Sequence, residues 1–204
     1  MKGVSEWYIR LGNMALNLFL LNILWLLFTV LGLVLITIFP ATAALFSVTR
    51  DFILKTGQNA IFKPFLYSFK KEFLRANLIG YTFSFVGLIL FINLFILQQL
   101  DYTFFHLSLT VVTLLICLVF LLSALMIFPV LIHYDLKVWR YFQYAVFITI
   151  GRPLHSIILL FGVGAIIFLF LQIPGLIPVF GVSLMALLIM KIASLSFPHS
   201  KQAA

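Results

Sequence analysis

The chain alternates long apolar runs with short segments that carry its charges. Apolar runs cover residues 14–39, 77–97, 106–128, 154–173 and 179–194. A helix that crosses a bilayer needs about 20 predominantly apolar residues. The pattern therefore predicts an all-α, polytopic membrane protein with about five transmembrane helices, in a single transmembrane domain over residues 1–204.

The order of these elements is partly repeated. Phe39 and Pro40 end the first run, Phe128 and Pro129 end the third, and an arginine follows each pair, at Arg50 and Arg140. An ancient duplication of helix pairs is one interpretation of this order.

Lysine and arginine gather in two of the connecting loops. Six lie in loop 50–75 and three in loop 133–152, whereas loops 98–103 and 173–178 contain none. Cytoplasmic loops are enriched in these residues, so both basic loops are expected in the cytoplasm. Five spans then place the C-terminus in the cytoplasm and the N-terminus outside.

A six-span alternative starts from the length of the first run. Residues 14–49 could cross twice, with a turn near Gly32, which would place both termini inside. Two crossings need about 40 residues, and the residues around Gly32 offer no polar turn chemistry. We therefore prefer five spans.

An amphipathic basic helix is predicted within the first basic loop, over residues 62–75. Its apolar positions recur at the spacing of one helical face: Phe62, Phe65, Leu66, Phe69 and Phe73. Such helices usually lie in the membrane interface, with their positive charges near anionic lipid. The alternative is a docking helix for another protein, and one helix can serve both roles.

Two groups of residues are candidates for specific roles. The predicted cytoplasmic platform for a partner consists of Pro40, Arg50, Phe65, Phe69, Lys70, Lys71, Arg75 and Asn77. Small residues let helices approach closely in membranes, and this predicts a helix contact along Gly80, Ser84 and Gly87. Asn93 is expected to bond a neighbouring helix, and Asn13 and Asn17 share one helical face.

Composition supports the membrane assignment. Hydrophobic residues make up 64% of the 204 and charged residues 9%, against about 25% charged in soluble domains. The net charge of +8 sits in loops between apolar spans, so we expect no nucleic-acid partner. Cys117 is the single cysteine, which leaves no intramolecular disulfide and no cysteine-based metal site.

Candidate chemistry is sparse. The histidines do not pair at the spacing of a helical metal site, and no nucleotide-binding or hydrolase motif is present. His133, Asp135 and Arg152 form the one polar set that could converge on a lipid or glycan substrate. We expect no enzyme activity and no cofactor.

The segment FPATAALFSVTR at residues 39–50 resembles the signature of the YesL-like family of bacterial membrane proteins, a family of unknown function. FKKEF at residues 69–73 and RAN at 75–77 also fit, and the second half of the chain is similar more loosely. The resemblance implies about five spans and no known catalytic residues. Such proteins are often encoded beside importers of the ATP-binding-cassette (ABC) type for oligosaccharides, which implies an accessory role in carbohydrate uptake.

The leading hypothesis is therefore an accessory subunit or partner of an ABC carbohydrate importer in the bacterial cell membrane, in contact with the permease subunits. The alternative is a small transporter or pore that acts on its own as an oligomer. Transporters usually place ionisable groups or broken helices at mid-membrane depth, and the five acidic residues lie in loops or at span edges. Neither the substrate nor the oligomeric state follows from the sequence.

Overall fold

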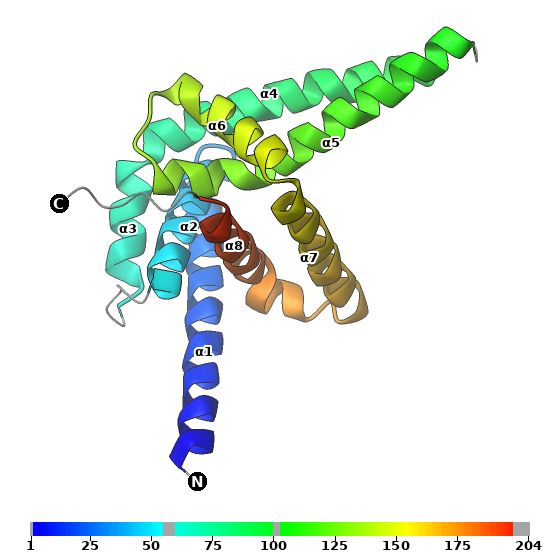
Figure 1. The fold of residues 1–204 in the computed structure, drawn as a ribbon. Helices are drawn as coiled ribbons and strands as arrows, with labels where there is room; N and C mark the ends of the chain where they lie inside the picture. The colour runs from blue at the N-terminus through cyan, green and yellow to red at the C-terminus, as the bar shows by residue number, and fades with distance from the viewer. Residues whose placement is uncertain (1, 55–59, 100–102, 198–204) are drawn as a thin grey trace, which may run out of the picture.

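The computed structural model describes residues 2–54, 60–99 and 103–197, and these residues fold into helices joined by short connections (Figure 1). In chain order the helices are α1 (Lys2–Leu31), α2 (Ile38–Leu54), α3 (Phe62–Lys71), α4 (Phe73–Leu97), α5 (Phe104–His133), α6 (Val138–Gly151), α7 (Pro153–Gln172) and α8 (Leu176–Ser196).

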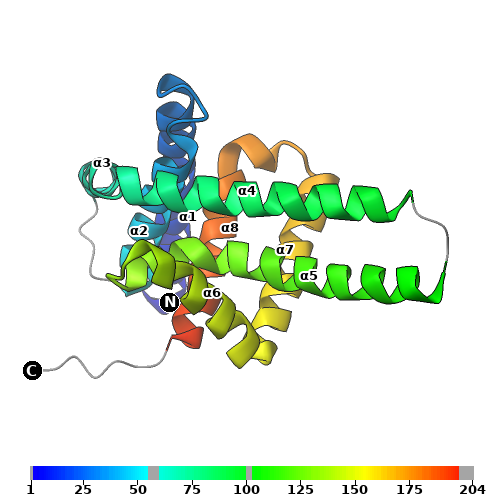
Figure 2. The ribbon, with the colours of Figure 1, turned by 90° about the horizontal axis from the view of Figure 1, so that it is seen from above.

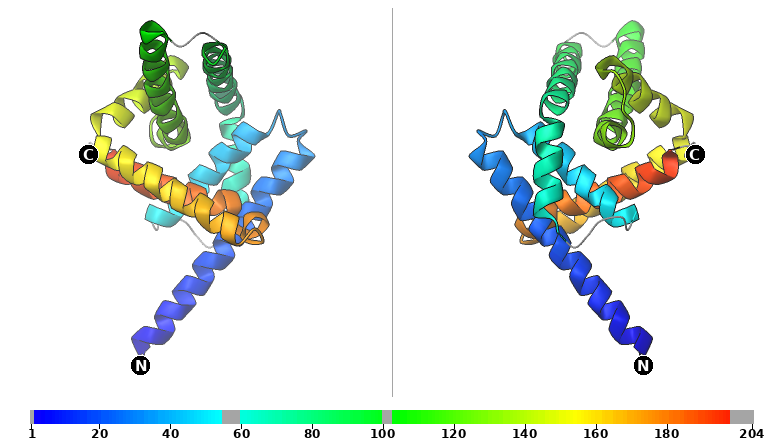
Figure 3. Two further views of the ribbon diagram at one scale, coloured as in Figure 1. Left: turned by 90° about the vertical axis from the view of Figure 1, so that its right-hand side faces the viewer. Right: turned by 90° about the vertical axis from the view of Figure 1, so that its left-hand side faces the viewer.

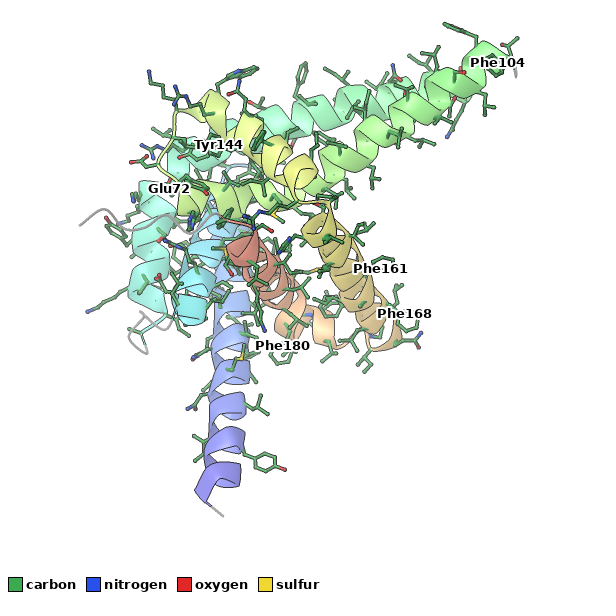
Figure 4. The ribbon with its side chains drawn as sticks, in the orientation of Figure 1. Glu72, Phe104, Tyr144, Phe161, Phe168 and Phe180 are labelled. Atoms are coloured by element: carbon green, nitrogen blue, oxygen red, sulfur yellow. The ribbon has the colours of Figure 1, made fainter. Side chains whose placement is uncertain are left out.

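Five of the helices are long and apolar enough to cross a membrane. The candidate spans are Leu11–Leu31, Phe73–Leu97, Phe104–His133, Pro153–Gln172 and Leu176–Ser196. Large apolar side chains cover their outer surfaces, such as Phe104, Phe161 and Phe168 (Figure 4). The predicted all-α class and the number of spans are confirmed, although α4, α5 and α8 run beyond the predicted limits.

The spans form two antiparallel hairpins and one separate helix. Helices α4 and α5 run side by side and project from the rest of the molecule (Figure 2). Helices α7 and α8 form the second hairpin, and α1 packs against α8. The N-terminal half of α1 extends away from the other helices (Figure 3).

The prediction of one continuous span over residues 14–39 is wrong. Helix α1 ends at Leu31, and residues 32–37 turn the chain back into α2 (Figure 3). Leu33 takes a left-handed backbone conformation, with φ of 59°, and the Thr37 hydroxyl donates to the carbonyl of Thr29 at 3.0 Å. The turn lies where the six-span alternative placed it. The turn is apolar and, beyond Gly32, lacks the usual glycine, proline or asparagine signals, so the sequence favoured one continuous span.

Helix α2 lies at the centre of the fold. It contacts α1, α3, α4, α5 and α8, and Ala41, Ala43 and Ala44 have no exposed surface. Such small side chains allow close helix approach without large packing groups. Pro40 occupies the first turn of α2, where its missing N–H breaks no helical hydrogen bond.

The interpretation as a duplication is not supported by the two Phe-Pro pairs. Pro40 starts α2, whereas Pro129 lies inside α5, four residues before that helix ends. The side chains differ as well: Phe39 packs over Gly80, whereas Phe128 stacks on Phe46 with ring centroids 5.9 Å apart.

Both basic loops contain helices that pack on the core. In loop 50–75 the predicted amphipathic helix is α3, which ends at Lys71, and α4 begins at Phe73, so Arg75 and Asn77 belong to α4. In loop 133–152 the chain forms α6, which packs along α5 with Tyr141 fully buried. Its 14 residues are too few for a crossing of about 20.

Gly80 permits the close approach of α4 to α2, and this generates a stability prediction. A Cβ atom at this position would lie 2.3 Å from the ring of Phe39. We expect Gly80→Ala to destabilise the protein by about 1–3 kcal/mol, because the ring must move within a packed core. Thermal unfolding in detergent measures the change.

Gly164→Ala is the matched control, because no atom lies within 4 Å of a Cβ atom there. This exposed site on α7 should gain up to about 1 kcal/mol from the better helix propensity of alanine. Equal unfolding temperatures for the two variants would contradict the close packing at Gly80.

Candidate functional site: the basic face and the α1–α8 junction

The aromatic side of α3 faces the interior of the protein. Phe65 has no exposed surface, and the ring of Phe28 on α1 makes edge contacts with Phe65 at 5.2 Å and Phe69 at 5.1 Å. The Ser68 hydroxyl donates to that of Ser47 on α2 at 2.8 Å. Helix α3 is therefore fixed to α1 and α2, and its main apolar side is not available to lipid or to a partner.

The opposite side of α3 and the first turn of α4 form an exposed surface, which we call the basic face. Its residues are Lys63, Tyr67, Lys70, Lys71, Leu74 and Arg75. Tyr67 is 68% exposed and Leu74 is 80% exposed, so two large side chains stand among four cations. A surface of this kind offers both charge and apolar contact area to a bound molecule.

The predicted platform residues divide between the interior and the surface. Pro40 and Phe65 are fully buried, and Phe69 is partly buried. Lys70 and Lys71 are exposed. In this conformation a partner can reach the two lysines but not Pro40 or Phe65.

The remaining platform residues have roles within the chain. Arg50 is half-buried and donates to the carbonyl of Ile132 at 3.4 Å, near the C-terminal end of α5. Positive charge is favourable at that end of a helix. Asn77 is half-buried on α4, and within the described residues its Oδ1 atom has no hydrogen-bond donor.

Two ion pairs connect the basic face with its surroundings. Arg75 donates to the carboxylate of Asp135 at 2.7 Å. Lys71 lies 3.8 Å from the carboxylate of Glu72, which is 7% exposed at the junction of α3 and α4 (Figure 4). Both pairs reduce the charge of the face, but Lys63 and Lys70 form no ion pair among the described residues.

Asp51 follows Arg50 near the end of α2. Burial raises the pKa of its carboxyl group, and the charge of Arg50 lowers it in part.

The members of the polar set proposed for an enzyme contact different partners. The ring of His133 stacks on Phe197 with centroids 4.2 Å apart, and Arg152 donates to the carbonyl of Leu195 at 2.9 Å. Asp135 instead bonds Arg75. The three side chains therefore serve separate contacts, and the described residues include no group of three or more His, Cys, Asp or Glu that could hold a metal ion.

The predicted helix-packing stripe is only partly at an interface. Gly80 lies under Phe39, and a Cβ atom at Gly87 would meet the ring of Phe120 on α5 at 3.2 Å. Ser84 is exposed, and its hydroxyl donates back to the carbonyl of Gly80. Asn93 accepts a bond from the Thr113 hydroxyl on α5 at 3.4 Å, which confirms the expected bond to a neighbouring helix.

Asn22 makes three side-chain hydrogen bonds to α8, and the sequence analysis did not single it out. Its side chain is 1% exposed. The amide nitrogen donates to the carbonyl of Pro178 at 2.8 Å, and the amide oxygen accepts from the N–H groups of Val182 at 3.1 Å and Ser183 at 3.3 Å. A lone asparagine within an apolar run was the signal that could have found it, as for Asn93.

The Asn22 amide therefore occupies a position within the hydrogen-bond ladder of α8. In a regular helix the N–H of Val182 would bond the carbonyl of Pro178, and here the side chain of another helix contacts both groups. Inserted side chains bend helices, and α8 changes direction between its first turns and its remainder (Figures 1 and 2). Asn13 is exposed and Asn17 is half-buried.

Together these features define a polytopic, all-α membrane protein with a basic face at one side of its core. A family model described as "Protein of unknown function, DUF624" matches residues 18–94, from α1 to α4. The chain is 37% identical to the uncharacterized protein YesV of Bacillus subtilis (strain 168) over 181 residues, which cover 89% of this chain and 86% of YesV. The chain belongs to this bacterial family of integral membrane proteins, as the YesL-like resemblance predicted.

Two further proteins of Bacillus subtilis (strain 168) are similar along most of their length. Uncharacterized protein YteU is 32% identical over 84% of this chain and 76% of its own length. Uncharacterized protein YesL is 31% identical over 92% of this chain and 88% of its own length. No solved structure matches the chain.

The contacts of Asn22 predict a large effect of its replacement. Asn22→Leu should destabilise the protein by about 1–3 kcal/mol for each buried α8 group left without a partner, as measured by unfolding in detergent. Asn13→Leu is the matched control, since Asn13 is exposed, and it should leave the unfolding temperature unchanged. An equal loss of stability in both variants would show that the contacts of Asn22 with α8 do not account for the effect.

Proposed function

We propose that this protein is an accessory subunit or partner of an ABC-type importer for oligosaccharides in the bacterial cell membrane. The observation that carries the proposal is the basic face, which is held rigidly on the core and exposes Tyr67 and Leu74 among its cations. The genomic association implied by the YesL-like resemblance supplies the substrate class.

The distribution of charge supports an orientation. The basic face and the start of the second basic loop, at Lys137 and Arg140, belong in the cytoplasm by the positive-inside rule, and the antiparallel pair of spans α7 and α8 returns the chain to the same side. The C-terminus is then cytoplasmic. A permease subunit within the same bilayer would meet the basic face from the cytoplasmic side.

The interior of the spans supports an accessory role over an ion-coupled carrier. No aspartate or glutamate lies in any of the five candidate spans, and carboxylates within spans are one of the usual means by which carriers couple transport to ions. We propose no catalytic step, since His133, Asp135 and Arg152 make separate contacts.

Copurification tests the proposal. The tagged protein, isolated from native membranes in mild detergent, should bring with it permease subunits and their ATPase in a fixed ratio. The double variant Tyr67→Ala/Lys70→Glu should reduce this recovery at least about tenfold, because it removes an exposed anchor and reverses a charge, changes that together cost more than about 1.4 kcal/mol.

Lys191→Glu is the matched control, because it reverses an exposed charge on α8, away from the basic face. It should copurify like the native protein. Phe65→Ser is not suitable as an interface variant, because Phe65 is buried against Phe28 and its loss would act on folding. Recovery of the protein without any importer subunit would refute the accessory role.

A transporter or pore that acts on its own is the second candidate, and the bend of α8 at Asn22 favours it. Discontinuous helices line the substrate sites of many transporters. This candidate predicts oligosaccharide flux into liposomes that contain the purified protein alone, with flux changed in Asn22→Asp and retained in Asn13→Asp. Liposomes without flux for a folded protein would remove this candidate.

A further inference from the structure

Two adjoining apolar hollows lie along α6, and one of them is between α6 and the α4–α5 hairpin. The first has a volume of about 450 Å³ and is lined by α4, α5 and Val146 of α6; the second has about 470 Å³ and lies along α6. Val146 lines both hollows, so the two meet at this residue. We infer that they hold the two acyl chains of one anionic phospholipid.

The shape of the first hollow suits a hydrocarbon chain. Its lining on α5 extends from Val112 to Ser123, which corresponds to about 16 Å at the helical rise of 1.5 Å per residue. Ser123 is the single polar residue of the lining, and its hydroxyl already donates to the carbonyl of Val119 at 2.7 Å. A ligand with polar groups along its length would find no partner there.

Three stacked rings line the hollows on the side of the core. Phe83 on α4 stacks on Phe142 of α6 at 5.1 Å and on Phe120 of α5 at 5.3 Å. Phe83 and Phe120 line the first hollow, and Phe142 lines the second. The three rings thus form a common inner wall that holds the two hollows side by side.

Positive charge at the beginning of α6 complements the headgroup of the lipid. Arg140 is exposed and lies on the same helical face as Gln143 and Phe147, which line the second hollow. Among the described residues the ion pairs are Lys71–Glu72 and Arg75–Asp135, so Arg140 has no ion-pair partner in that part of the chain. Trp139, which is 70% exposed, has the amphipathic ring that favours headgroup depth.

The direction of α6 places this charge where a headgroup lies. The Tyr141 hydroxyl donates to the carbonyl of Tyr134, just after α5 ends, and Thr149 lies 3.5 Å from Ser123, well inside α5. Helix α6 therefore runs from the polar end of α5 back along its apolar length. Arg140 lies toward the polar end, and the apolar hollows extend from it along the membrane-spanning part of α5.

Native mass spectrometry of the delipidated full chain tests the inference. With equal amounts of dioleoyl phosphatidylglycerol and dioleoyl phosphatidylcholine, the native protein should retain one phosphatidylglycerol per chain. Val146→Trp should abolish this retention, because the indole fills the junction of the hollows. Arg140→Gln should lower the preference for phosphatidylglycerol about fivefold, the value of one basic residue near anionic lipid.

Matched controls separate the site from general membrane effects. Ile157→Trp adds the same ring at an exposed position of α7, and Lys63→Gln removes one charge from the basic face; both should bind lipid like the native protein. If Val146→Trp does not fold, Ile116→Trp, which fills the first hollow from an exposed position, takes its place.

Several results would overturn the inference. One is equal retention of the two lipids by the native protein, and another is unchanged retention in both tryptophan variants. A third is a lipid-free dimer that Val146→Trp dissociates, because a second copy of the chain would then occupy the hollows. These outcomes do not bear on the importer partnership, which concerns the basic face.

Discussion

The small side chains of α2 set the distance at which its neighbours pack, and most of the architecture depends on that distance. Inside a membrane, water does not drive helices together, so close van der Waals contact must do so. Ala41, Ala43 and Ala44 are fully buried and let α1, α3, α4, α5 and α8 contact one helix. This arrangement explains why α2, with 17 residues, is surrounded by protein although its composition resembles that of a span.

The central place of α2 also determines what the basic side of the molecule presents. Because α3 is fixed to α1 and α2 through Phe65 and Ser68, its lysines stand on a rigid support. If the aromatic side of α3 were instead buried in lipid, the lipid and not the protein core would determine the position of the helix. The aromatic side of this amphipathic basic helix thus forms an internal contact, and its basic side forms an exposed surface.

The apolar runs predicted the helical class and five spans, because length and hydropathy decide whether a helix can cross a bilayer. They left the turn at residues 32–37 to the rejected six-span alternative, since an apolar turn carries little local signal and depends on contacts such as the hydrogen bond from Thr37 to Thr29. The periodicity of Phe65 and Phe69 predicted one apolar face but not its partner. Both lipid and the ring of Phe28 are apolar, so the periodicity alone does not tell which of them this face contacts. The packing of α1 against α3 decides it.

The contacts of Asn22 also link the order of synthesis to the completion of the fold. Asn22 and its acceptors and donors in α8 are separated by about 160 positions along the chain, so α1 enters the membrane long before α8 exists. During that interval the Asn22 amide lies in an apolar environment without its final partners, or α1 stays close to the membrane interface. Helix α8, which is translated after α1, thus supplies the partners that satisfy the Asn22 amide inside the bilayer.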